Sequence, residues 1–296
     1  MDKIDPYLRL ARVQKQIGTQ LLLLPCYWGL ALSSPTMVPS LWTLGLFTVG
    51  AFSCRSAGCI INDFADRDID KHVDRTKARP LTTGELSTTQ AGTFLAGLMG
   101  LNFSILFSLP PESVKLGLMV TPLVFLYPTT KRFFAYPQLV LGLTFNSGVF
   151  IGYAAQQALN WQVCLPFYLG GVIWTIIYDS VYAFQDRAFD KKLNLRSTAI
   201  EMERRPKETL SALSALSVSM FALGGFQAGL SMPFYLGLSG VAAHYAWQIK
   251  TLDIENRESC WDRFVANRWL GLLLTASILA GRFTFQPEEN TEESST

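Results

Sequence analysis

Charged residues and histidine are scarce in this sequence. Only 16% of its 296 residues are charged and two are His, whereas about a quarter of the residues in an average soluble domain are charged. The five Cys form no Cys-x-x-Cys pair, so they are expected to be buried thiols and not zinc ligands. These shortages argue against a soluble fold and against a zinc-binding protein.

The sequence is instead rich in long apolar runs. Hydrophobic residues make up 49% of the chain, and most runs approach the ~20 residues that a membrane-spanning helix needs. They lack the two-residue alternation of barrel strands. The runs cover residues 17–32, 41–61, 88–109, 114–127, 137–158, 163–184, 210–230, 232–249 and 269–283. The sequence therefore predicts an all-α multi-pass membrane protein with nine transmembrane helices.

The nine runs form a single expected domain over residues 1–296, with an interfacial segment at 1–16 and an acidic, disordered tail at 284–296. Most of the 25 Lys and Arg lie in the N-terminal segment and in the loops after the even-numbered spans. Nine spans would place all of these on one side, which the positive-inside rule assigns to the cytosol or the mitochondrial matrix. We expect the lipid bilayer, and no nucleic acid, as a partner.

The N-terminal residues do not resemble a mitochondrial presequence. They include Asp2 and Asp5, whereas presequences are rich in Arg and poor in acidic residues. No transit peptide is therefore expected within this sequence. An integral protein of the mitochondrial inner membrane is expected if the source is eukaryotic.

A first acidic cluster, "NDFADRDID", ends the second apolar run. If the helix continues, Asn62, Asp66 and Asp70 are four residues apart and share one face, with Asp63 beside them. Like charges at this spacing repel each other, and a divalent cation would remove the repulsion. Oxygen ligands on one face suit Mg²⁺, which shares its coordination shell with phosphates.

A second cluster, "YDSVYAFQDRAFD", ends the sixth apolar run. Asp179, Asp186 and Asp190 recur at steps of seven and four, which again places them on one helix face. A solvated, charge-balanced loop is the plain alternative. Two clusters on one side, both reaching into apolar runs, favour function instead. Together they predict Mg²⁺ around one diphosphate, with Lys and Arg completing the site.

Arg55 is a charged residue inside an apolar run. It precedes Asn62 by seven residues, about two helical turns deeper on the same face. A guanidinium at that depth needs an anionic partner or a polar cavity. The sequence predicts that it binds a carboxylate or a diphosphate oxygen; a structural salt bridge inside the bundle is the alternative.

The two clusters resemble the motifs of a known family. NDxxDxxxD followed by "RTKARPL", and YDxxYAxQDxxxD followed by "STA", are similar to motifs of the UbiA superfamily of intramembrane prenyltransferases. The resemblance is closest to its members that prenylate 4-hydroxybenzoate in ubiquinone biosynthesis. Other stretches, including "RSAGCIIND" and "YPTTKRFFAYPQLVLGLTFN", extend it from about residue 9 to about residue 281.

The resemblance implies nine helices around a cavity and Mg-dependent transfer of a polyprenyl group from a prenyl diphosphate to an aromatic acid, most closely 4-hydroxybenzoate, with release of diphosphate. It implies catalytic roles for Asp66, Asp70, Asp186 and Asp190, and metal binding by these four and Asp179. It implies substrate contacts by Arg55, Asn62, Asp63, Tyr127, Lys131, Arg132, Tyr178, Asp179 and Tyr182.

The sequence departs from the family pattern at a few positions. Phe189 stands where close relatives usually carry Asp, and Asn194 and Arg196 replace a usual Gly and Lys. Asp186 and Asp190 remain, so the departures bear more on rate and acceptor choice than on reaction type. Another acceptor, such as an aromatic polyketide acid, homogentisate or a naphthoate, stays open. So do a membrane transporter and an inactive scaffold. Prenyl chain length and oligomeric state are not predicted.

Overall fold

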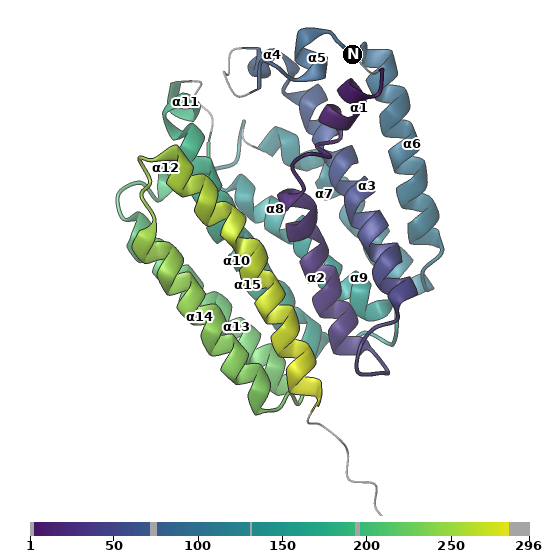
Figure 1. Cartoon of the computed structure of the whole chain (residues 1–296), viewed down its shortest axis with the longest axis vertical. Coiled ribbons are helices and arrows are strands. Elements are labelled where there is room, and N and C mark those ends of the chain that lie inside the picture. Colours follow the sequence, from purple (N-terminus) through teal and green to yellow (C-terminus); the bar gives the residue numbers. More distant parts are fainter. Residues whose placement is uncertain (1–2, 72–75, 131, 193–195, 284–296) are drawn as a thin grey trace, which may run out of the picture.

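Helices are the only regular structure in the part of the chain that the computed structural model describes, which is residues 3–71, 76–130, 132–192 and 196–283. Figure 1 shows them as one bundle, with α1, α4, α5 and α11 at the same end. In chain order the helices are α1 (Asp5–Leu10), α2 (Ile17–Ser33), α3 (Leu41–Ala65), α4 (Arg67–Asp70), α5 (Pro80–Thr83), α6 (Thr88–Phe107), α7 (Pro111–Thr130), α8 (Pro137–Asn146), α9 (Gly148–Ala154), α10 (Trp161–Ala183), the 3-10 turn η1 (Phe184–Asp186), α11 (Arg187–Lys192), α12 (Thr198–Glu201), α13 (Pro206–Gln227), α14 (Met232–Thr251) and α15 (Arg257–Phe283).

Five described stretches are long and apolar enough to cross a membrane. They are α3, α6, the run Trp161–Lys192 that contains α10, α13, and most of α15, while α2 is apolar but shorter. The prediction of an all-helical protein with several membrane-spanning segments is therefore confirmed. The count of nine spans stays a prediction, for which α2, α7, α8 with α9, and α14 supply the other segments.

Two of the predicted spans differ from the observed helices in where they begin or end. The fifth, 137–158, is divided at Ser147 into α8 and α9. The division lets α9 lie directly against α2: a Cβ on Gly152 would come within 2.4 Å of the carbonyl oxygen of Cys26. The ninth, 269–283, is the apolar part of a longer helix that begins at Arg257, because the first turns of this helix carry charged residues.

Local sequence signals explain where several helices begin. The Ser40 hydroxyl accepts the N–H of Thr43 at 3.1 Å and caps α3. Ser87 and Gln90 cap each other's backbone N–H at the start of α6. Proline stands in the first turn of α8, α13 and α14, where a missing N–H costs no hydrogen bond.

Aromatic side chains from distant helices join the bundle at its centre. Trp28 of α2 is fully buried, with its ring centroid 5.2 Å from that of Trp174 and 5.5 Å from that of Phe221. Its indole N–H donates to the Thr275 hydroxyl at 3.1 Å, which satisfies the polar atom. This contact ties together α2, α10, α13 and α15.

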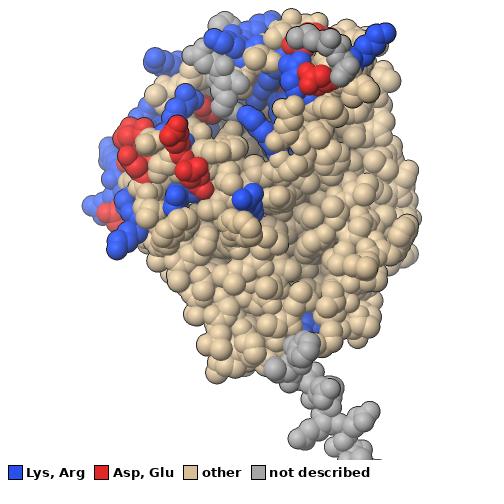
Figure 2. Space-filling model, in the orientation of Figure 1, with Lys and Arg blue, Asp and Glu red and all other residues tan. Residues whose placement is uncertain are grey.

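The charged side chains on the visible face gather at one end of the bundle. Figure 2 shows blue and red residues over the end that holds α1, α4, α5 and α11, while the sides below are almost entirely uncharged. Large apolar side chains such as Phe107, Met119, Phe226 and Leu236 are exposed on the long helices α6, α7, α13 and α14. An uncharged flank below a charged end is the surface that a bilayer requires.

Candidate functional site

A cavity of about 860 Å³ lies among α2, α3, α6, α7, α8, α9 and α10. Its volume falls in the range of ~300–1,000 Å³ that is usual for ligand sites. The predicted site residues that line it are Arg55, Asn62, Asp63, Asp66, Asp70, Tyr127, Arg132, Tyr178, Asp179, Tyr182, Asp186 and Asp190. Lys131 lies outside the described residues. The cavity therefore brings together every predicted site residue that the structure describes.

The first acidic motif lies on two helices and not on one. Helix α3 ends at Ala65, and Asp66 leaves the helical conformation with φ −100° while its N–H still donates to the Asn62 carbonyl at 2.9 Å. Helix α4 then carries Asp70. The expected continuous helix face is therefore wrong. The Asn62 amide donates to the Asp66 carboxylate at 3.1 Å, and Asn62, Asp66 and Asp70 all line the cavity.

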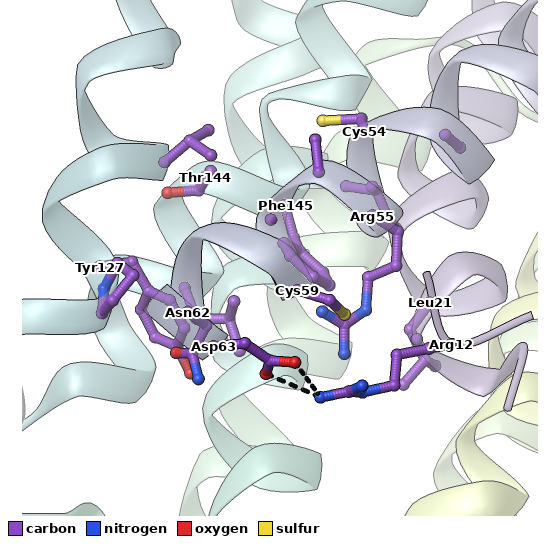
Figure 3. A pocket seen from close by; sticks show the side chains of 18 of the residues that line it. Arg12, Leu21, Cys54, Arg55, Cys59, Asn62, Asp63, Tyr127, Thr144 and Phe145 are labelled. Atoms are coloured by element: carbon purple, nitrogen blue, oxygen red, sulfur yellow. Dashed lines mark hydrogen bonds and ion pairs between the residues drawn. The ribbon is translucent and has the colours of Figure 1, made fainter. Parts of the chain in front are cut away.

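Asp63 is a buried ion-pair centre. It is 2% exposed and accepts hydrogen bonds from one Arg12 nitrogen at 2.7 and 2.8 Å. One guanidinium nitrogen of Arg79 lies 2.9 Å from the carboxylate of Asp63, and the same nitrogen lies 2.5 Å from the carboxylate of Asp70. Figure 3 shows the Arg12–Asp63 pair at the cavity wall. A buried carboxylate needs such partners, and these pairs hold Arg12 and Arg79 at the cavity wall; the substrate contact expected of Asp63 stays a prediction.

Arg12 and Arg79 were not predicted as site residues. Arg12 comes from the segment before α2, 51 residues from Asp63, and its backbone has φ +57°, a conformation that non-glycine residues rarely adopt. The charge of this segment was visible in the sequence, but its partner was not. Arg79 stands in the "RTKARPL" stretch, whose match to the family was the available signal.

The second acidic motif is also interrupted. Helix α10, which carries Asp179, ends at Ala183; η1 contains Asp186, and α11 carries Asp190. The prediction of one helix face is wrong here too, although the three side chains line the same cavity. Asp190 is 9% exposed, and Asp186 pairs with Arg257 at 3.3 Å.

Phe189, the departure from the family pattern, also lines the cavity. It belongs to α11, the same short helix that carries Asp190. An apolar ring therefore takes part in the wall beside the second motif. The two carboxylates on either side of it in the sequence remain in place.

Arg55 points into the cavity from α3, as Figure 3 shows. Cys59, Tyr127, Tyr182 and the carboxylate of Asp179 line the same cavity. Across the described ranges, no hydrogen bond or ion pair of Arg55 is found, so the structural salt bridge considered from sequence is not found there. A cation oriented in this way is suited to an anionic ligand.

Ion pairs also join the segments around the charged end. Arg9 of α1 pairs with Glu85, and this hydrogen bond lowers the pKa of the Glu85 carboxyl. The Lys191 ammonium donates to Glu203 and lowers the pKa of that carboxyl. Arg132 donates to the Ala65 carbonyl at 2.8 Å, next to the first motif.

The acidic side chains fit a magnesium ion that is shared with a ligand. In the described part of the chain, no three His, Cys, Asp or Glu side chains form a ready-made metal site. Mg²⁺ is commonly held by one or two carboxylates, with waters and substrate phosphates completing the shell. Two acidic motifs on one cavity are compatible with that pattern.

Comparison with known proteins places the chain in a family. Residues 22–272 match the UbiA prenyltransferase family. The chain is 43% identical over 292 residues to the mitochondrial 4-hydroxybenzoate polyprenyltransferase of Mus musculus, covering 98% of this chain and 77% of the relative. The Homo sapiens relative of the same name is 44% identical over 280 residues, covering 94% and 76%.

Solved structures agree in fold. A UbiA homolog from Archaeoglobus fulgidus bound to GPP and Mg²⁺ has a TM-score of 0.74 at 21% identity, covering 93% of this chain and 98% of that one. The apo UbiA homolog from Aeropyrum pernix K1 has a TM-score of 0.73 at 25% identity, covering 88% and 96%. The chain therefore belongs to the UbiA prenyltransferase family.

Proposed function

We propose that this protein transfers a polyprenyl group from a prenyl diphosphate to the ring of 4-hydroxybenzoate and releases diphosphate, a step of ubiquinone biosynthesis in the mitochondrial membrane. The observation that carries the proposal is the convergence of both acidic motifs and Arg55 on one cavity. The relatives named 4-hydroxybenzoate polyprenyltransferase, at about 43% identity over most of the chain, support the acceptor and the compartment.

The charged end of the cavity takes the diphosphate. Asp66 and Asp70 from the first motif, and Asp179, Asp186 and Asp190 from the second, would hold Mg²⁺ there, with Asn62 orienting Asp66. When bound, Mg²⁺ draws negative charge from the diphosphate and makes it a better leaving group. Arg132, at 4.0 Å from Asp66, adds positive charge beside the same group. Lys131 is proposed to do the same.

The apolar part of the cavity takes the isoprenoid chain. Met99, Phe103 and Leu106 of α6 and Val120 and Val124 of α7 line it. An isoprenoid tail is as apolar as lipid, so we propose that it enters from the bilayer side. These walls also exclude water, which would otherwise react with an allylic cation.

Arg55 takes the carboxylate of the aromatic acid. It lies ten residues before the end of α3 at Ala65, roughly 15 Å along the axis of a helix, so its backbone is farther from the charged end than the first acidic motif. Tyr127, Tyr178 and Tyr182 line the same cavity, and aromatic faces stabilise cations. This arrangement would hold the ring between its anchored carboxylate and the reacting carbon of the donor.

The reaction that fits these positions is an electrophilic aromatic substitution. The bond between the allylic carbon and the diphosphate oxygen breaks, and the diphosphate leaves with the electron pair. The ring carbon ortho to the phenol forms the new C–C bond. The proton of that carbon passes to a cavity carboxylate or to the diphosphate, which restores the aromatic ring.

We further propose that nine segments cross the membrane and that the loops at 63–87 and 185–208 share the side of the N-terminus. The gathering of charge at one end of the molecule supports this orientation. Single cysteines in each loop, treated with an impermeant thiol reagent, would react from the same side. Reaction from opposite sides would rule out the shared site.

The test of the function is prenyl transfer by purified full-length protein. We expect a prenylated 4-hydroxybenzoate from prenyl diphosphates in the presence of Mg²⁺, and none after chelation. Homogentisate, a naphthoate and an aromatic polyketide acid, tested in parallel, would react more slowly. Faster transfer to one of these would correct the acceptor, and no transfer to any of them, without diphosphate release, would overturn the proposal.

A further inference from the structure

The guanidinium of Arg55 rests on the backbone of a neighbouring helix. Gly18, in the first turn of α2, lines the same cavity and faces Arg55 of α3. A Cβ built on Gly18 would lie 2.3 Å from Nε of Arg55, 3.0 Å from Nη2 and 3.1 Å from Cζ. Only a residue without a side chain leaves room for the guanidinium at this place.

The other glycine of α2, Gly29, serves a different purpose. A Cβ on Gly29 would meet the backbone of α9, at 2.2 Å from the Val149 carbonyl oxygen and 2.8 Å from the Tyr153 nitrogen. Backbone cannot move aside without separating the helices, so Gly29 is needed for helix packing. At Gly18 the obstacle is the far end of a flexible side chain, which can move while the helices stay in place.

We propose that Gly18 is a positioning residue for the acceptor: it forms the slot that holds the Arg55 guanidinium against α2, aimed at the aromatic carboxylate. The inference rests on the proposed carboxylate role of Arg55. In Gly18→Ala the guanidinium must move by about 1 Å to restore ordinary contact with the new methyl group. A misplacement of ~1 Å at a binding group can cost as much as ~10²-fold.

The prediction is a selective effect on one substrate. Gly18→Ala should raise the KM for 4-hydroxybenzoate by roughly tenfold or more, while the KM for the prenyl diphosphate changes by less than about twofold. Direct titration of 4-hydroxybenzoate without the donor should show the same loss of affinity. The thermal unfolding midpoint should stay at the wild-type value, whereas Gly29→Ala should lower it.

Two further variants separate positioning from a general effect of the methyl group. Gly45→Ala is the matched control, because a Cβ at Gly45 meets nothing within 4 Å and Gly45 is not among the residues that line the cavity. It should behave as wild type. In an Arg55→Ala background, Gly18→Ala should raise the KM for 4-hydroxybenzoate no further, since the group that it displaces is gone.

The outcomes distinguish this inference from the proposed function. If Arg55→Ala raises the KM for 4-hydroxybenzoate and Gly18→Ala does not, the positioning role of Gly18 is overturned and the proposed function stands. The positioning role would also be overturned if Gly18→Ala raised the KM for 4-hydroxybenzoate by the same factor with and without Arg55. If Arg55→Ala leaves the KM for 4-hydroxybenzoate unchanged in stable protein, the proposed role of Arg55 fails and the inference fails with it.

Discussion

The two acidic motifs reach the same cavity but are neutralised in different surroundings. In the first, Asp63 and Asp70 pair with arginines that are largely enclosed: the side chain of Arg12 is 21% exposed and that of Arg79 is 16% exposed. In the second, Asp186 pairs with Arg257, whose side chain is 63% exposed. Water screens an exposed pair and screens a buried pair far less.

This difference in exposure indicates that the ion pairs of the first motif serve folding, whereas the pair at Asp186 is available for ligand binding. The arginines of the first motif come from the N-terminal segment and from the loop before α5, so the motif joins distant parts of the chain. The pair at Asp186 lies at the rim and can be exchanged for a ligand at little cost. The Asp63 and Asp70 pairs of the first motif are thus set when the protein folds, and the Asp186 pair of the second remains adaptable.

The largest expected effect is the loss of activity when either motif loses a central carboxylate. Asp66→Ala and Asp186→Ala should each reduce prenyl transfer by about 10²–10³-fold or more, because each removes a group that helps to stabilise the charge of the departing diphosphate. The measurement is product formation by purified protein that retains its native unfolding midpoint.

Asp68→Ala is the control for these variants. Its side chain is 93% exposed, it lies in the same turn as Asp66 and Asp70, and it is not among the cavity-lining residues. It should keep nearly full activity. Activity within a few-fold of wild type in either motif variant would contradict the model of two cooperating motifs.

The second prediction compares the stability of the two motifs. Asp63→Ala leaves Arg12 and Arg79 without their shared partner, and breaking a buried pair in this way costs about 3–5 kcal/mol. Arg257→Ala breaks only a rim pair, for which the cost is about 0–1 kcal/mol. Unfolding in detergent measures both. Equal losses would show that the two environments do not differ as described.

Sequence spacing located both motifs but not their shape. Asn62, Asp66 and Asp70 were predicted on one face because residues four apart are neighbours on a helix. These side chains line one cavity, while the expected continuous helix is wrong, since α3 ends at Ala65 and η1 follows α10. Periodicity identifies a face, but a local break that depends on tertiary contacts leaves no periodic signal.

Long-range partners were the main omission. Arg12 reaches Asp63 across 51 residues and adopts a left-handed backbone that no local pattern announces. The contact of Gly18 with Arg55 was equally hidden, because it depends on how α2 crosses α3. Such pairs follow from helix packing, and a single sequence carries no direct record of it. Arg55 itself was predictable, because a charge inside an apolar run is costly.

The third prediction concerns Arg55, which takes part neither in the ion pairs of the first acidic motif nor in that of the second. Arg55→Ala should weaken binding of the aromatic acid by roughly ten- to a hundredfold, as expected for a charge-assisted hydrogen bond of about 1.5–3 kcal/mol. Arg55→Lys should recover only part of this, because an ammonium cannot make two parallel bonds to a carboxylate. Steady-state KM values for both substrates measure the effect. A raised KM for the prenyl diphosphate instead would place Arg55 at the donor.

The smallest expected effect lies outside the membrane, at Glu203 beside the second motif. Lys191 and Arg187 lower the pKa of its carboxyl in the folded protein, with the hydrogen bond from Lys191 as the main cause. A depressed pKa stabilises the folded state above the unfolded pKa, and this contribution is lost as the pH falls through the folded value. Glu203→Gln should therefore lower the unfolding midpoint slightly at pH 7.

The difference between Glu203→Gln and wild type should then shrink as the pH falls below the ordinary glutamate pKa of 4.5 and vanish once the wild-type carboxyl is protonated. Unfolding midpoints of both proteins between pH 7 and acid measure this convergence. Glu201→Gln is the matched control, because this neighbouring exposed carboxylate has no ion pair among the described residues, and it should leave the unfolding midpoint at pH 7 unchanged. A Glu203→Gln difference that stays constant with pH would mean that the carboxylate charge contributes nothing to holding the second motif.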